Sequence, residues 1–152
     1  MNIVVSLPLV FKFSGVVGLI YAIFAKVGFL PKFILNGKSK LIPSIELSDK
    51  DDRHILAAAI ACKASQIITF NIRDFPKTVL DGYKIVALHP DEFIASLITL
   101  KPITMLNQVE TVRKRLLYPP KTSNEYLEIL LKQGLPLSVS MLKELQNTQN
   151  TM

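Results

Sequence analysis

The side chains in this chain that are best suited to chemistry lie between Asp49 and Pro76. Three aspartates precede an alanine-rich segment, and three further polar residues end or follow the next apolar run: Asp49, Asp51, Asp52, Thr69, Asn71 and Asp74. In a parallel α/β sheet, the start of a helix and the end of the following strand face the same edge. Carboxylate and amide oxygens gathered there suit a hard cation such as Mg²⁺ or Mn²⁺. The spacing therefore predicts a cation-binding crevice.

The elements that must position these residues alternate between helix and strand. The alanines of segment 57–61 predict a helix that packs closely on a sheet, and the β-branched run at 66–70 predicts a buried strand. Pro76 begins a short helical turn, and a further strand is expected at 84–88. A helix begins near Pro90, because proline suits the first turn. This order predicts an α/β fold with a short parallel sheet flanked by helices.

The first 40 residues are very apolar and contain five lysines but no acidic residue. The run at 3–5 predicts a parallel strand, and apolar residues at helical spacing from 16 to 27 predict a buried helix. The competing interpretation is a membrane or targeting segment. The charge-free run at 13–25 is shorter than the roughly 20 residues that a spanning helix needs, and no positive charge precedes Lys12 as a secretory signal requires. We therefore expect a buried strand and helix, and no membrane anchor.

The last third of the chain has a different pattern, without strand signals. Residues 102–117 form an amphipathic helical pattern, which the Pro119-Pro120 pair interrupts. The sequence Thr122-Ser123-Asn124-Glu125 predicts a capping box that opens another helix. Gly134-Leu135-Pro136 ends this helix. A final helix follows, with a frayed polar tail from Gln146. We therefore expect two domains, residues 1–95 with the sheet and an all-helical C-terminal extension at 96–152.

Composition limits the class of protein. The chain has 152 residues, of which 49% are hydrophobic and 20% charged, as in globular domains. The net charge of +6 favours a polyanionic partner, either nucleic acid or an acidic protein, although it could also serve solubility alone. The sequence suggests few exposed aromatic residues near the lysines. Cys62 is the single cysteine, which excludes an internal disulfide and is typical of the cytoplasm.

Several of these motifs together resemble the PIN-domain nucleases, in particular VapC-type toxin ribonucleases with an extra helical C-terminus. The resemblance covers about residues 41–147. It is carried by the pairing of Asp-Asp-Arg-His at 51–54 with Asn-x-x-Asp-Phe-Pro at 71–76, and by Pro-Asp-Glu-Phe at 90–93. It implies a PIN-like α/β domain, metal-dependent hydrolysis of RNA with Mg²⁺ or Mn²⁺, and the toxin role in a toxin–antitoxin system. The implied partners are RNA and a cognate antitoxin protein.

The resemblance also implies roles for individual residues. Asp52 and Asp74 become catalytic residues and metal ligands, and Asn71 becomes a further ligand. Thr69, Asp51 and His54 would support this site. The alternatives are ordinary structural roles. Asp52 could cap its helix, with Asp49 or Asp51 as other candidate caps. Asn71 and Asp74 could stabilise a turn, and His54 could be a partly buried polar residue.

The basic run Arg113-Lys114-Arg115 is a separate candidate site for nucleic-acid binding. Phosphate contacts require only positive charge and reach, which three adjacent basic residues on a helix supply. The alternative is a solvated helix face. The histidine at position 89 is expected in a loop before Pro90.

The sequence departs from the family pattern in its first third. The family's first strand ends in an aspartate, whereas Ser6 follows the strand here, and no acidic residue occurs before Pro43. We therefore expect a truncated or divergent PIN protein, with an atypical first 40 residues and part of the acidic site missing. The alternative function is a catalytically inactive PIN remnant that binds proteins. Apolar surface left uncovered would also favour a homo-oligomer.

Overall fold

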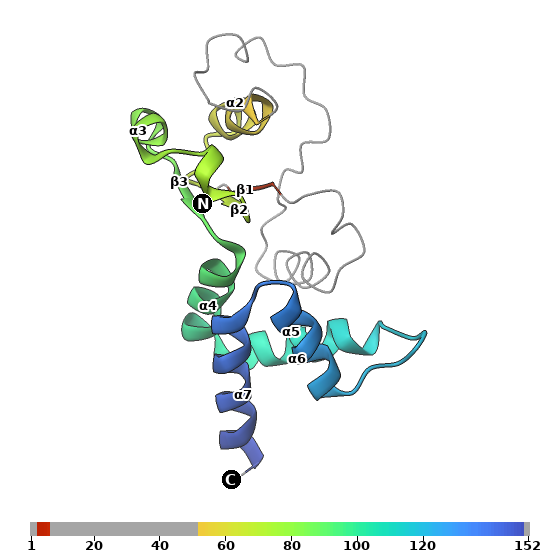
Figure 1. Cartoon of the computed structure of the whole chain (residues 1–152). Helices are drawn as coiled ribbons and strands as arrows, with labels where there is room; N and C mark the ends of the chain where they lie inside the picture. Colours follow the sequence, from red (N-terminus) through yellow and green to blue (C-terminus); the bar gives the residue numbers. More distant parts are fainter. Residues whose placement is uncertain (1–2, 7–51, 151–152) are drawn as a thin grey trace. The chain divides into compact units, whose positions relative to one another are not determined.

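The computed structural model describes residues 3–6 and 52–150 (Figure 1). The described residues fall into two compact units, one of residues 3–6 and 52–89, and the other of residues 90–150. The predicted helix at 16–27 lies outside the described residues. In the part that the structure describes, no helix is long and apolar enough to cross a membrane.

The first unit contains a parallel sheet of three strands in the order β1, β2, β3. The strands are β1 (Ile3–Ser6), β2 (Gln66–Thr69) and β3 (Val86–Leu88). Helix α2 (Arg53–Ala61) packs against β1 and β2. The register pairs Ile3 with Gln66 and Ser6 with Thr69, so β1 and β2 end side by side. The predicted α/β class and the strands at 3–5 and 66–70 are confirmed.

Helix α2 has only nine residues, because the chain reverses direction just after Ala61. Its buried face holds Ile55, Leu56, Ala57 and Ala59, and the two alanines allow close contact with the sheet. The chain leaves the helix through Lys63, which has a left-handed conformation with φ of 52°. The N–H of Ala64 then donates to the carbonyl of Ala59 at 2.8 Å, which closes the helix end. This reversal leads directly into β2.

Three short helical segments connect β2 to β3: η3 (Ile72–Asp74), α3 (Lys77–Leu80) and η4 (Asp81–Tyr83). Pro76 is the N-cap of α3, as predicted. The strand predicted at 84–88 begins only at Val86 in the structure. Lys84 cannot belong to it, because this residue has a left-handed φ of 57° and ends η4. Phe75, Leu80 and Ile85 belong to the same buried cluster as the α2 residues.

The second unit consists of four helices: α4 (Pro90–Leu100), α5 (Pro102–Lys114), α6 (Ser123–Lys132) and α7 (Pro136–Asn150). Helix α4 packs against α5 and α7, and α7 also contacts α5 and α6. The predicted helical C-terminal part is confirmed. Helix α4 runs through position 95, where the sequence predicts the domain division, and that division stays a prediction.

The helix ends in this unit follow the sequence signals, with two corrections. Thr122 and Glu125 form the predicted capping box at the start of α6. Helix α5 ends at Lys114 and not at 117, because Leu117 pairs with Pro120 in an isolated antiparallel bridge. The tail predicted to fray from Gln146 is helical to Asn150, and Gln146 Nε2 donates to Ser123 Oγ at 3.0 Å.

Candidate functional site

Asp52 stands immediately before α2, at its N-cap position. Its carbonyl oxygen accepts from the N–H groups of Ile55 and Leu56 at 3.0 and 3.4 Å. Its carboxylate makes no capping hydrogen bond to the helix. The alternative interpretation, in which the Asp52 side chain caps α2, is therefore not supported by its geometry. The half-buried carboxylate lies where the positive end of the helix dipole favours an anion.

The residues after β2 form a hydrogen-bonded turn. Thr69 is buried, and its Oγ1 accepts from the backbone N–H of Asn71 at 3.1 Å. The amide Nδ2 of Asn71 donates in turn to Oδ2 of Asp74. The turn predicted as the structural alternative is thus present. It uses one nitrogen of Asn71 and one oxygen of Asp74, so the Asn71 amide oxygen and Asp74 Oδ1 are the atoms that could bind a cation.

The topology places Asp52 and this turn at one edge of the sheet. Helix α2 packs on β1 and β2 and leads into β2, so it runs antiparallel to the strands. Its start therefore lies at the edge where the strands end, together with Thr69 and, in register beside it, Ser6. Ser6 occupies the strand end at which the PIN family has an aspartate. Asp51 and Asp49 lie outside the described residues.

The chemistry of this donor set fits Mg²⁺ better than a softer metal. Its candidate ligands are oxygens from two carboxylates and one amide, and Mg²⁺ often takes one or two carboxylates and completes its shell with water or substrate phosphate. Among residues 52–149, no three Asp, Glu, His or Cys side chains gather into a metal site. The described protein ligands would therefore provide only part of a coordination shell.

The two histidines have different surroundings. His54 is half-buried in the first turn of α2, two positions after Asp52. His89 lies in the loop before α4, as predicted, and its ring meets that of Phe70 edge to face with centroids 5.0 Å apart. Since Phe70 separates Thr69 from Asn71 in the chain, this aromatic contact helps to hold the end of β2.

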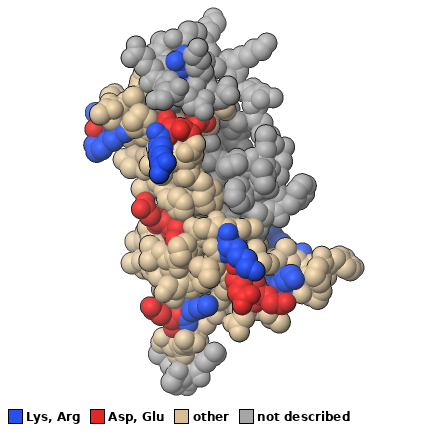
Figure 2. All heavy atoms as spheres, in the orientation of Figure 1, with Lys and Arg blue, Asp and Glu red and all other residues tan. Residues whose placement is uncertain are grey.

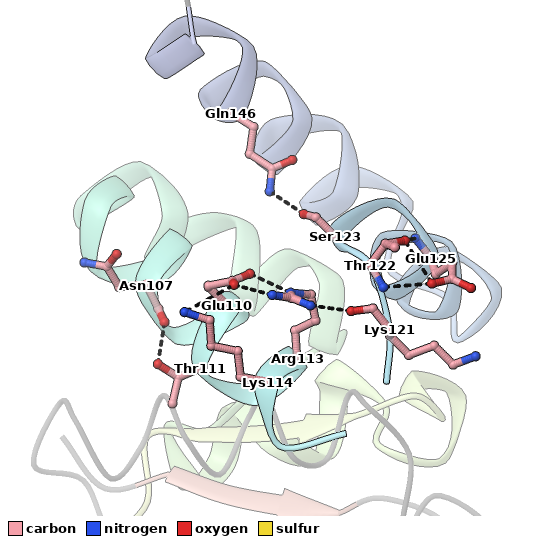
Figure 3. Close-up of polar contacts among 10 residues, drawn as sticks. All are labelled: Asn107, Glu110, Thr111, Arg113, Lys114, Lys121, Thr122, Ser123, Glu125 and Gln146. Carbon is pink, nitrogen blue, oxygen red and sulfur yellow. Dashed lines mark hydrogen bonds and ion pairs between the residues drawn. The ribbon is translucent and has the colours of Figure 1, made fainter. Parts of the chain in front are cut away.

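The basic run at the end of α5 contains three residues with different environments (Figure 3). Arg113 donates to Glu110 from Nε at 2.7 Å and from Nη2 at 2.5 Å, and its Nη1 donates to the carbonyl of Lys121. Lys114 lies 3.6 Å from the same glutamate. Arg115 is exposed. Arg113 thus has a structural role in joining α5 to the start of α6, and phosphate contact by the run stays a prediction.

Hydrogen bonds shift the pKa values of these partners. The hydrogen bond from Arg113 lowers the pKa of Glu110, and the same contact raises the pKa of Arg113. The backbone N–H of Thr122, and then its hydroxyl, lower the pKa of Glu125. Both glutamates therefore stay ionised to a lower pH than an ordinary glutamate does.

Sequence reasoning missed two residues that the structure makes prominent. Asp91 is buried and binds the start of α7, and Tyr118 is 96% exposed beside the basic run. Few exposed aromatic residues were expected near the lysines, and Tyr118 is one of them. The two prolines that follow it, at 119 and 120, could have indicated an exposed turn here, because turns and loops lie mostly on the surface.

The described residues form a parallel sheet packed against α2, and a separate helical unit follows it in the chain. A family model, the VapC50 C-terminal domain, matches residues 90–144. A protein of Mycobacterium tuberculosis named "Putative ribonuclease VapC50" is 35% identical over 82 residues, which are 54% of this chain and 48% of that protein. The resemblance to VapC-type PIN proteins with a helical C-terminal part is thereby confirmed.

The chain thus covers about half the length of this relative. No solved structure matches the chain.

Proposed function

We propose that this chain acts as a metal-dependent PIN-type endoribonuclease and as the toxin of a toxin–antitoxin pair. The observation that carries the proposal is the placement of Asp52 and the Thr69–Asn71–Asp74 turn at one edge of a parallel sheet. The similarity to a protein named as a ribonuclease supports it. The substrate would be RNA, and the partner a cognate antitoxin.

In this proposal, Asp52 and Asp74 hold Mg²⁺ or Mn²⁺, and the amide oxygen of Asn71 assists them. When bound, such a cation lowers the pKa of a water and offsets the charge that develops on the phosphate. Thr69 positions Asn71 through the 3.1 Å bond to its backbone N–H. His54 is the candidate proton donor, because it lies half-buried in the first turn of α2, two positions after Asp52. Asp51 would add negative charge to the same site.

The test is cleavage of labelled RNA by the purified chain with Mg²⁺ or Mn²⁺. Asp52→Asn should lower the rate by more than about 100-fold, because loss of outer-shell partners alone typically costs 10–100-fold. The matched control is Asp81→Asn. Asp81 is an exposed aspartate of the same unit that pairs with Lys77 at 2.6 Å, outside the proposed site. Equal rates for the wild type and Asp52→Asn would contradict the site assignment.

One observation favours a second function, a protein-binding module without catalysis. Ser6 ends β1 in register with Thr69, where the family has an acid, so the strand end lacks a carboxylate. A neutral hydroxyl is a poor replacement for a carboxylate around a divalent cation. Under this alternative, Mn²⁺ would not raise the melting temperature, and a partner would bind without any added metal. Self-association of the chain stays a prediction of the same alternative.

A further inference from the structure

The connection between α5 and α6 presents an aromatic ring on a short, rigid turn. Leu117 and Pro120 form an antiparallel bridge, so the chain reverses at Tyr118 and Pro119. Two consecutive prolines fix two backbone φ angles of this turn. Tyr118 is 96% exposed, so both faces of its ring are open to solvent. A rigid turn holds such a ring without the entropy loss that a flexible loop would suffer on binding.

The base of this turn is fixed to the helices on both sides. Arg113 binds Glu110 with two nitrogens and the carbonyl oxygen of Lys121 with a third (Figure 3). The capping box of Thr122 and Glu125 begins one residue later. The end of α5 and the start of α6 are thereby joined at the base of the turn that carries Tyr118.

The turn lies in a stretch of sequence whose charged residues are all basic. From Thr111 to Asn124 the sequence contains no acidic residue and four basic ones: Arg113, Lys114, Arg115 and Lys121. Figure 2 shows basic and acidic side chains together over α5 and α6, with an uncharged tip where the connection projects. The acids that border the stretch are engaged locally, Glu110 with Arg113 and Glu125 with Thr122. Lys114 is 69% exposed, and Lys121 points away from the Arg113–Glu110 pair in Figure 3.

We propose that the α5–α6 turn binds single-stranded RNA, with one base stacked on Tyr118 and the adjoining phosphates held by Lys114, Arg115 and Lys121. Single-stranded RNA is bound by aromatic rings that stack on unpaired bases and by cations that follow the backbone. The proposal rests on the proposed function, since it identifies how its RNA substrate is held. An acidic protein surface would satisfy the cations, but it would leave the Tyr118 ring without a planar partner.

The test is fluorescence anisotropy of a short 5′-labelled oligouridylate titrated with the full-length chain in EDTA, so that metal-dependent cleavage has no influence. Tyr118→Ala should raise the Kd by roughly 5- to 150-fold, the usual loss for one base stack. Tyr118→Phe should retain the affinity, because the ring remains. The control is Tyr83→Ala, another exposed tyrosine, which lies in η4 and should have no effect. An unchanged Kd for Tyr118→Ala would overturn the proposal.

A second measurement tests the cations. Replacing Lys114, Arg115 and Lys121 together by glutamine should reduce the slope of log K against log salt by about 2, near 0.7 for each phosphate contact. An unchanged slope would overturn the phosphate contacts. Displacement of labelled RNA by polyglutamate as effectively as by unlabelled oligouridylate would overturn RNA as the class of ligand.

The outcomes separate this proposal from the proposed function. Weaker RNA binding by Tyr118→Ala in a chain that cleaves no RNA would support the turn as an RNA contact and contradict the ribonuclease activity. Cleavage that depends on Asp52, together with unchanged RNA binding by Tyr118→Ala, would support the activity and contradict the turn.

Discussion

Asp91 of α4 binds Ser138 in the first turn of α7, 47 positions away in the chain. Its Oδ1 accepts from the backbone N–H of Ser138 at 2.8 Å and from the Ser138 hydroxyl at 2.6 Å. Its Oδ2 accepts from the N–H of Leu137 at 2.8 Å. These N–H groups have no acceptor within their own helix, so Asp91 caps α7 from a different element. The contact fastens α4 to α7 within the domain that the family comparison matches.

Replacing Asp91 by alanine should therefore destabilise the helical unit. The change removes three hydrogen bonds to a buried carboxylate and leaves the donors of Leu137 and Ser138 unsatisfied, at a cost of about 2–4 kcal/mol. Urea unfolding followed by circular dichroism measures this loss.

Two control variants identify the origin of that effect. Ser138→Ala removes only the hydroxyl and should cost about 1 kcal/mol. Glu92→Ala removes the neighbouring exposed acid and should change the unfolding free energy by less than about 1 kcal/mol. If Asp91→Ala and Glu92→Ala had the same midpoint, Asp91 would not be the cap of α7.

The capping box of α6 should give the stability of the helical unit a pH dependence. Hydrogen bonds from Thr122 lower the pKa of Glu125 below its ordinary value in the folded chain. A lowered folded-state pKa stabilises the fold above the unfolded-state pKa, and this contribution is lost as the pH falls through the folded-state value. Glu125→Gln should therefore be less stable than the wild type at pH 7.

The difference between the two proteins should shrink below about pH 4.5, near the ordinary pKa of glutamate, and should vanish at lower pH. Urea midpoints measured across this range provide the test. Thr122→Ala should cost about 1 kcal/mol at pH 7 as a second measure of the same cap. A difference for Glu125→Gln that persists undiminished in acid would contradict this account.

In the basic run at the end of α5, Arg113 should contribute to the stability of the fold, whereas the solvent-facing Arg115 should not. The Arg113 side chain is 22% exposed and joins Glu110 to the Lys121 carbonyl. Arg113→Gln should therefore lower the urea midpoint, and Arg115→Gln should leave it unchanged within error. Arg115→Gln should also reduce the salt dependence of the affinity for single-stranded RNA. A stability loss in Arg115→Gln equal to that in Arg113→Gln would disprove the division.

Local signals in the sequence predicted most of the fold that the structure describes. The capping box at Thr122, the break at Gly134-Leu135-Pro136 and the apolar run at 66–70 each contain the residues that their structures need. Gly134 has a positive φ of 86°, and Leu135 N–H then donates to the Leu130 carbonyl, which ends α6. The predicted element bounds are wrong where an unusual backbone conformation or a tertiary contact decides them. Lys84 has a left-handed φ, and Gln146 is held by its hydrogen bond to Ser123.

The common sheet edge of the candidate residues was predictable from the sequence, but their contacts were not, and their catalytic and metal-binding roles stay predictions. The spacing of Asp52, Asn71 and Asp74 indicates a common sheet edge, and the topology agrees. The bond from Asn71 to Asp74 could not be deduced from the sequence, because a turn and a cation site require the same residues. Asp91 was missed because its partners lie in a helix 46 and 47 positions further along the chain.

Adding the acid that β1 lacks should strengthen cation binding. Ser6 is in register with Thr69 at the edge where Asp52 and Asp74 are proposed to bind a metal. Ser6→Asp would place a further carboxylate at this edge, and its attraction to a divalent cation should raise the Mn²⁺ affinity by about 10-fold or more. Isothermal titration measures the change, with Ser6→Asn as the uncharged control. Equal affinities of Ser6→Asp and Ser6→Asn would place the site elsewhere.

The central claim is that the edge formed by α2 and the end of β2 binds a divalent cation. Isothermal titration of Mn²⁺ into the full-length chain, beside its Asp52→Ala and Asp81→Ala variants, tests this claim most directly. We expect saturable binding in the wild type and in Asp81→Ala, and its loss in Asp52→Ala. No binding in the wild type, or equal binding in Asp52→Ala, would contradict the claim.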